Sequence, residues 1–163
     1  MKNKDNHHSL PDFPENQCFG CSPENEFGLQ MKFDVVEDRV ISKLKVPQHL
    51  CGWKKLVHGG VTSTILDEIM SWSVIYSQKS FVMTKLMTVE FLSPMNVNES
   101  LTAKGKVLQV TGKRDVSAEG FIYNEKGKLC AKSQGNFVLL SPKIAKRMGL
   151  VEDANYPWFS TNE

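Results

Sequence analysis

The segment spanning residues 59–78 constrains the fold more than any other part of the chain. It reads GGVTSTILDEIMSWSVIYSQ and contains no proline, and no glycine after its first two residues. Two apolar stripes recur along it at helical spacing, one formed by Val61, Ile65, Ile69, Trp72 and Tyr76 and the other by Leu66, Met70 and Val74. A helix that is apolar over so much of its circumference is buried on most sides. We therefore expect the rest of the chain to wrap around it.

Runs with strand character lie on both sides of this segment. Before it, residues 30–46 form two short runs around a turn at Glu37-Asp38, with apolar side chains at alternating positions. After it come four longer runs separated by turn residues, over residues 81–94, 100–111, 115–125 and 128–141. With one long helix available, the economical arrangement is an α+β fold. We expect an antiparallel sheet of five to six strands wrapped around one long central helix.

Length and charge restrict the protein class. A chain of 163 residues is long enough for one domain with a real core. We expect a flexible N-terminal arm over residues 1–16, a folded domain over 17–141 and a C-terminal tail over 142–163. A net charge of +2 gives no reason to expect nucleic acid as a partner. The sequence contains no run of about 18 apolar residues, which is the length that would predict a membrane span. The polar N-terminus does not resemble a secretory signal. We expect a cytoplasmic protein whose cysteines are thiols.

The carboxylate pair Asp67-Glu68 lies inside this apolar helix. On an arbitrary helix, such a pair marks the solvent face. Here the two stripes leave little solvent face, and the helix begins with His58-Gly59-Gly60. Glycines allow another group to approach the backbone closely, and a helix N-terminus offers unpaired N–H donors and a partial positive charge. The pattern predicts a site for an oxyanion, with a carboxylate deeper along the helix.

The segment HGGVTSTILDE resembles the helix start of hotdog-fold acyl-CoA thioesterases, particularly the phenylacetate-pathway type. That family places its catalytic Asp nine residues after the His, and His58 and Asp67 keep this spacing. Further likeness covers roughly residues 18–140, in the segments CFGCSPENEFGLQMKF, TVEFLSP and GKLCAKSQGNFV. The resemblance implies a hotdog fold and an acyl-CoA substrate.

The resemblance also implies a role for each matching residue. Asp67 would be the general base or nucleophile, and the backbone N–H of Gly59 would polarise the thioester carbonyl. His58 would orient the substrate near its sulfur, and Thr84 would position the attacking water. Members of the family form dimers with shared sites, so we expect a homodimer or a homotetramer in which Asp67 and Thr84 meet from different subunits.

Substrate binding is expected from further residues of the same pattern. Gly60 belongs to the helix start, and Lys113 and Arg114 lie in a basic turn, GKRD. The resemblance implies that this turn binds the phosphates of coenzyme A. The alternative is an ordinary solvated turn without a binding role.

Glu68 is assigned to the substrate-binding group and not to the chemistry. Adjacent helical side chains diverge by about 100°, so Glu68 faces away from Asp67, toward a dimer contact or the wall of the acyl tunnel. The open alternatives are a structural ion pair, for instance with Lys85 or Lys54, or a second carboxylate that repels Asp67.

Cys18 and Cys21 form a Cys-x-x-Cys pair, whereas Cys51 and Cys130 are isolated. A zinc site usually needs four ligands, so we expect no metal and assign the pair to a buried N-terminal segment. A zinc-binding or redox role is the alternative. We expect no cofactor, because coenzyme A is part of the substrate.

These observations favour hydrolysis of an acyl-CoA thioester to a free acid and coenzyme A. Two alternatives stay open, a hotdog-fold hydratase or dehydratase acting on acyl thioesters and a non-catalytic acyl-CoA-binding protein.

Overall fold

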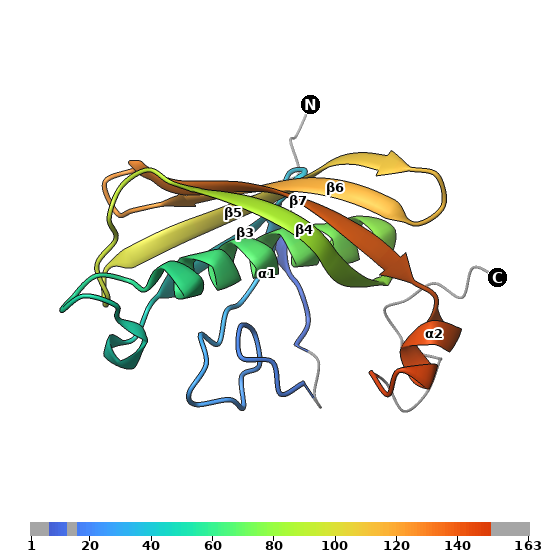
Figure 1. Cartoon of the computed structure of the whole chain (residues 1–163), viewed down its shortest axis with the longest axis horizontal. Coiled ribbons are helices and arrows are strands. Elements are labelled where there is room, and N and C mark those ends of the chain that lie inside the picture. Colours follow the sequence, from blue (N-terminus) through green and yellow to red (C-terminus); the bar gives the residue numbers. More distant parts are fainter. Residues whose placement is uncertain (1–6, 13–15, 151–163) are drawn as a thin grey trace.

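The computed structural model describes residues 7–12 and 16–150. Over these ranges an antiparallel sheet curves over one long helix, α1 (Gly59–Gln78), as Figure 1 shows. The predicted α+β architecture is confirmed. The described part of the sheet has seven strands instead of the five to six expected.

The strands are β1 (His7–Ser9), β2 (Asp34–Val36), β3 (Arg39–Lys45), β4 (Phe81–Phe91), β5 (Ser100–Thr111), β6 (Asp115–Tyr123) and β7 (Leu129–Leu140). Their order across the sheet is β1-β2-β3-β5-β6-β7-β4, so β4 forms one edge. Two short helices, η1 (Gln48–Leu50) and α2 (Pro142–Arg147), complete the elements. No helix among the described residues is long and apolar enough to cross a membrane.

The additional strand is β1, which lies within the expected flexible arm. Its backbone pairs with β2, with His7 opposite Val36 and Ser9 opposite Asp34. Leu10 follows it and is buried. The prediction of an arm therefore does not hold for residues 7–10. Their polar character gave no strand signal because the side chains of an exposed edge strand need not be apolar. Residues 1–6, 13–15 and 151–163 lie outside the described residues, and the other domain boundaries stay predictions.

A row of small residues crosses the sheet beneath α1. Gly105 on β5 pairs with Gly120 on β6, which pairs with Ser133 on β7. A Cβ atom at position 105 would lie 2.5 Å from the backbone oxygen of Ile69 and even closer to the Ser73 hydroxyl. Glycine at this crossing therefore lets α1 lie directly on the sheet and fixes the height of its side chains above it.

The segment from residue 16 to residue 33 covers the side of α1 that faces away from the sheet (Figure 1). The ring of Phe33 stacks on Trp72 of the helix with centroids 4.7 Å apart. Gly20 approaches the Glu68 side chain so closely that a Cβ there would lie 2.5 Å from its carboxyl carbon. α1 is thus enclosed between the sheet and this N-terminal segment.

Candidate active site

The start of α1 is capped by His58. Its backbone is extended, and its Nδ1 accepts a 2.9 Å hydrogen bond from the N–H of Gly60. Because Nδ1 is the acceptor, the proton of the neutral ring lies on Nε2. His58 is exposed, so that this second nitrogen can donate to a ligand. The N–H of Gly60 is correspondingly engaged by the cap.

The N–H of Gly59 has no acceptor among the described residues. The first N–H groups of a helix lack intrahelical partners, and the partial positive charge of the helix end favours an anion there. A cavity of about 240 Å³ opens at this point, between Gly59 and the chain that leaves β4, Phe91–Met95. Phe91, which the sequence did not single out, stands over Gly59 and is 60% exposed.

Asp67 lies further along the helix, under the edge strand. The Thr84 hydroxyl on β4 donates a 2.7 Å hydrogen bond to its Oδ1. The two residues therefore meet within one chain, and the prediction that they meet from different subunits is wrong. The physical reason is that β4 follows α1 directly and forms the sheet edge beside it, which places the first half of β4 against the middle of the helix.

Glu68 points away from Asp67, as the helical geometry predicted, and lies against the N-terminal segment. Its Oε1 is 3.3 Å from Cys18 Sγ. An ion pair with Lys85 is not formed, because the Lys85 ammonium lies 2.8 Å from Asp115. Burial raises the pKa of Glu68 to about 8, with the negative charge of Cys18 as the next cause. Glu68 was predicted to bind substrate. Its side chain instead points toward the segment 16–33 and away from the cavity at Gly59.

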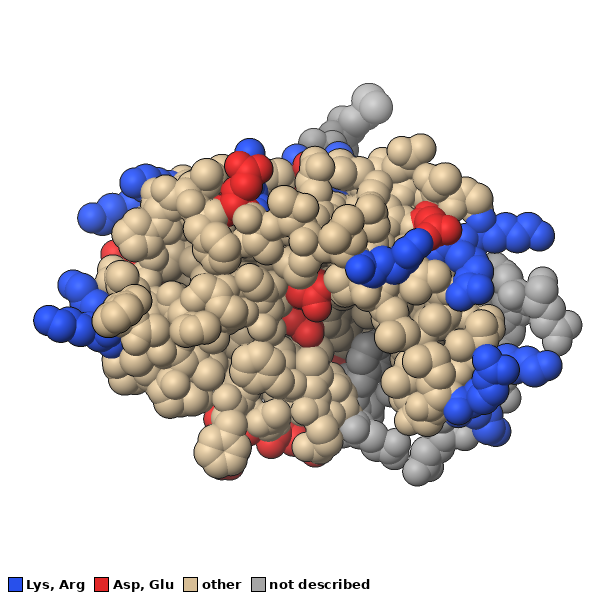
Figure 2. Space-filling model, viewed as in Figure 1, with Lys and Arg blue, Asp and Glu red and all other residues tan. Residues whose placement is uncertain are grey.

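Lys113 and Arg114 form the exposed turn between β5 and β6. This turn belongs to the Thr84 end of the sheet, because Asp115 pairs with Val138, which pairs with Met83. Figure 2 shows Lys and Arg side chains at both ends of the molecule, including the end that carries this turn and α2. α2 contributes Lys146 and Arg147 in its last turn.

The predicted site residues therefore form two groups. Asp67, Thr84 and the basic turn lie toward one end of the sheet, and His58 with Gly59 lies toward the other. Asp67 is eight positions after Gly59 in the helix, a distance of about 12 Å along the axis. An oxyanion donor and a base must each lie about 3 Å from the same reacting group. One chain alone therefore does not present both groups to one thioester.

Residues 54–131 match the family model of the thioesterase superfamily. An uncharacterized protein of Schizosaccharomyces pombe is 34% identical over 94 residues, which are 55% of this chain and 53% of that protein. The chain thus spans about half the length of this curated relative. The predicted resemblance to the superfamily is confirmed.

Solved structures confirm the hotdog fold. A thioesterase superfamily protein designated RHA08564 is 26% identical with a TM-score of 0.66, covering 71% of this chain and 57% of its own. The Escherichia coli PaaI protein, from the phenylacetic acid degradation operon, is 21% identical with a TM-score of 0.62, covering 69% and 80%. A hypothetical thioesterase of Streptococcus pneumoniae, solved with coenzyme A, is 22% identical with a TM-score of 0.61, covering 68% and 85%.

Proposed function

We propose that this chain, whose residues 54–131 match the thioesterase superfamily, hydrolyses an acyl-CoA thioester. The observation that carries the proposal is the half-buried Asp67 carboxylate, held at one oxygen by Thr84 on a helix that starts with His-Gly-Gly. A carboxylate so oriented is a base or nucleophile with a fixed direction of attack.

A dimer built on β4 completes the site. β4 is an edge strand of eleven residues with exposed apolar side chains at Met83, Leu86 and Phe91, and an unpaired edge of this kind favours pairing with another strand. The middle of the face in Figure 2, along which β4 runs in Figure 1, carries few charged side chains. Both features support antiparallel pairing of two β4 strands.

This pairing also resolves the separation between the two groups of residues. A two-fold axis near the middle of β4 places Phe91 of the second copy opposite the Met83–Thr84 end of the first. Since Phe91 stands over Gly59, the helix start of the second copy comes beside Asp67 of the first. The shared site then combines Asp67 and Thr84 of one chain with Gly59 and His58 of the other.

The chemistry follows from these positions. Asp67 takes a proton from the attacking water, or attacks the thioester carbonyl itself and forms an anhydride that water then hydrolyses. In either case the negative charge that develops on the carbonyl oxygen meets the Gly59 N–H. One such donor typically lowers the barrier by about 2.7–4 kcal/mol. As the C–S bond breaks, the Nε2–H of His58 donates a hydrogen bond to the departing thiolate, which takes its proton from water. The products are a carboxylic acid and a thiol.

Coenzyme A is the proposed thiol carrier. The Streptococcus pneumoniae neighbour was solved with this compound, and Lys113 and Arg114 lie at the Asp67 end of the proposed site. Guanidinium and ammonium groups are suited to phosphates. The acyl group then packs against the apolar side chains around α1.

The test is a panel of acyl-CoA esters with short, long and aromatic acyl groups. Hydrolysis is followed by the loss of thioester absorbance, because the four thiols of this chain would react with a thiol reagent. We expect turnover of at least one member. Hydration of an enoyl-CoA without thioester cleavage would identify a hydratase, and saturable binding without turnover would identify a binding protein. Either result would contradict the proposal.

A further inference from the structure

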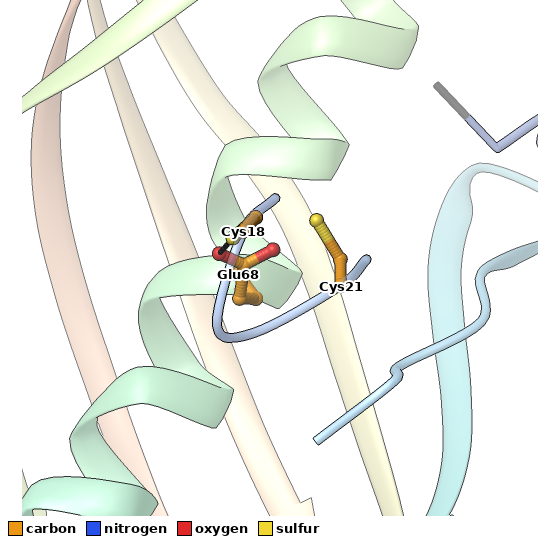
Figure 3. A group of neighbouring side chains, drawn as sticks. All are labelled: Cys18, Cys21 and Glu68. Atoms are coloured by element: carbon orange, nitrogen blue, oxygen red, sulfur yellow. Dashed lines mark hydrogen bonds between the residues drawn. The ribbon is translucent and has the colours of Figure 1, made fainter. Parts of the chain in front are cut away.

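The segment 16–33 and α1 bring three potential metal ligands together outside the proposed active site. Cys18, Cys21 and Glu68 converge on one point in Figure 3, two from the N-terminal segment and one from the helix. Their ligand atoms all lie within 4.8 Å of one another. Cys18 and Glu68 are 50 residues apart in the chain, which is why the Cys-x-x-Cys pair alone did not reveal a third ligand.

We propose that Cys18, Cys21 and Glu68 bind a divalent zinc ion that fastens the N-terminal segment to α1. Zinc accepts thiolate sulfur at about 2.3 Å and carboxylate oxygen at about 2.0–2.2 Å in a tetrahedral arrangement. Those lengths place the ligand atoms about 3.5–3.8 Å apart. The observed spacing therefore needs only a small contraction around the ion, with water in the fourth position.

Hydrogen-bond donors already contact both cysteine sulfur atoms. The N–H of Gly20 donates to Cys18 Sγ at 3.2 Å, and the side-chain amide of Asn16 donates to Cys21 Sγ at 3.3 Å. Such donors favour negatively charged sulfur. The fold of the turn is held separately by the hydrogen bond from Ser22 N to Cys18 O, at 3.0 Å, so the ligands are positioned before any ion arrives.

The electrostatics of the cluster also favour a cation. No Lys, Arg or His among the described residues forms an ion pair with Glu68. Buried carboxylates are costly without a partner, and a cation bound at this point would supply one for Glu68. Thiolate ligands select zinc over magnesium or calcium. Cys18 is half-buried, so an ion can reach the cluster from solvent.

The test uses the full chain, reduced and freed of metal with a chelator, and titrated with Zn²⁺ against a chromophoric competitor. Cd²⁺ serves as a second probe, because its charge-transfer absorption reports thiolate ligands. We expect one equivalent of either ion and the thiolate band. Hydrogen exchange of the segment 16–33 should slow on addition of Zn²⁺, since the ion joins the segment to α1.

Variants assign the ligands. Cys18→Ser and Cys21→Ser should each reduce the Cd²⁺–thiolate absorption, because one of the two sulfur ligands is lost. Each should also weaken Zn²⁺ binding at least about tenfold. Glu68→Gln should weaken binding but keep the Cd²⁺ band. Cys51→Ser, which removes a half-buried thiol outside the cluster, is the matched control and should bind as the parent does.

Three outcomes would overturn the proposal. The first is a parent chain that takes up neither ion, which needs no variant to interpret. The second is binding that survives in the double Cys18→Ser, Cys21→Ser chain, which would place the ion elsewhere. The third is formation of a Cys18–Cys21 disulfide in air by a chain that binds no metal when reduced, which would make the cysteines a redox pair.

Discussion

The Thr84 hydroxyl and the Asp67 carboxylate are joined by a 2.7 Å hydrogen bond between the edge strand and the central helix of the same chain. The bond occupies Oδ1 and sets the direction of the carboxylate. This relationship gives Thr84 a more specific role than holding a water, because it orients the group to which we assign the chemistry.

Removing this hydroxyl should slow hydrolysis. A hydrogen bond to a charged group contributes about 1.5–3 kcal/mol, so Thr84→Val should lower kcat by about 10- to 100-fold. Thr84→Ser keeps the donor and should stay close to the parent. The measurement is the steady-state rate on the best acyl-CoA of the panel. Equal kcat values for Thr84→Val and the parent would exclude the orienting role.

The contact between α1 and the sheet predicts a sensitive glycine. Gly105→Ala would place a Cβ against the backbone of Ile69, so that the helix must move away from the sheet. Overpacking of this kind typically costs about 1–3 kcal/mol, which chemical denaturation can measure. Thr102→Ala, on the opposite face of the same strand, should change the free energy of unfolding by less than about 0.5 kcal/mol. Similar values for the two variants would argue against a direct helix–sheet contact.

The proposed dimer places Leu86 near its two-fold axis. Leu86 is 61% exposed in the single chain, so Leu86→Lys should leave the monomer fold intact. Two ammonium groups facing each other at the axis should raise the dimer dissociation constant at least about tenfold. Analytical ultracentrifugation gives that constant. Leu108→Lys is the control, because Leu108 is 46% exposed on the inner strand β5. A monomeric parent chain at micromolar concentration would contradict the shared site itself.

The basic turn should act on the nucleotide part of the substrate. Replacing Lys113 and Arg114 with Ala should raise KM for acyl-CoA up to about tenfold at low salt, since exposed charge pairs are individually weak. The effect should fade as salt screens the charges over about 8–10 Å. A short thioester without the nucleotide should show little change.

The matched control for this turn is the double replacement of Lys43 and Lys45, which are exposed on β3, four strands from β4. It removes the same charge at a distance from the site. Equal effects of both double variants would mean that overall charge, and not the turn, attracts the substrate.

Most of the fold could be predicted from local sequence patterns. The helix over residues 59–78 and the four long strands after it were predicted because periodicity and turn residues are local signals, and the turn at Glu37-Asp38 was found for the same reason. β1 was not predicted, because an exposed edge strand pairs through its backbone and needs no pattern of apolar side chains.

The candidate site likewise combines features visible in the local sequence with features that depend on the tertiary fold. The spacing from His58 to Asp67 was visible in the sequence, whereas the placement of Thr84 in the same chain depends on which strand occupies the sheet edge. The contact between Glu68 and Cys18 joins residues 50 positions apart, so no local pattern contained it.

The most direct test of the account is hydrolysis by Asp67→Asn beside Glu68→Gln, with circular dichroism to verify that both variants are folded. Loss of a positioned base typically costs at least about a hundredfold, so Asp67→Asn should lower kcat/KM for acyl-CoA by that factor. Glu68→Gln should retain most of the activity, because Glu68 faces the cysteines and not the proposed site. Near-normal turnover by a folded Asp67→Asn chain would contradict the account.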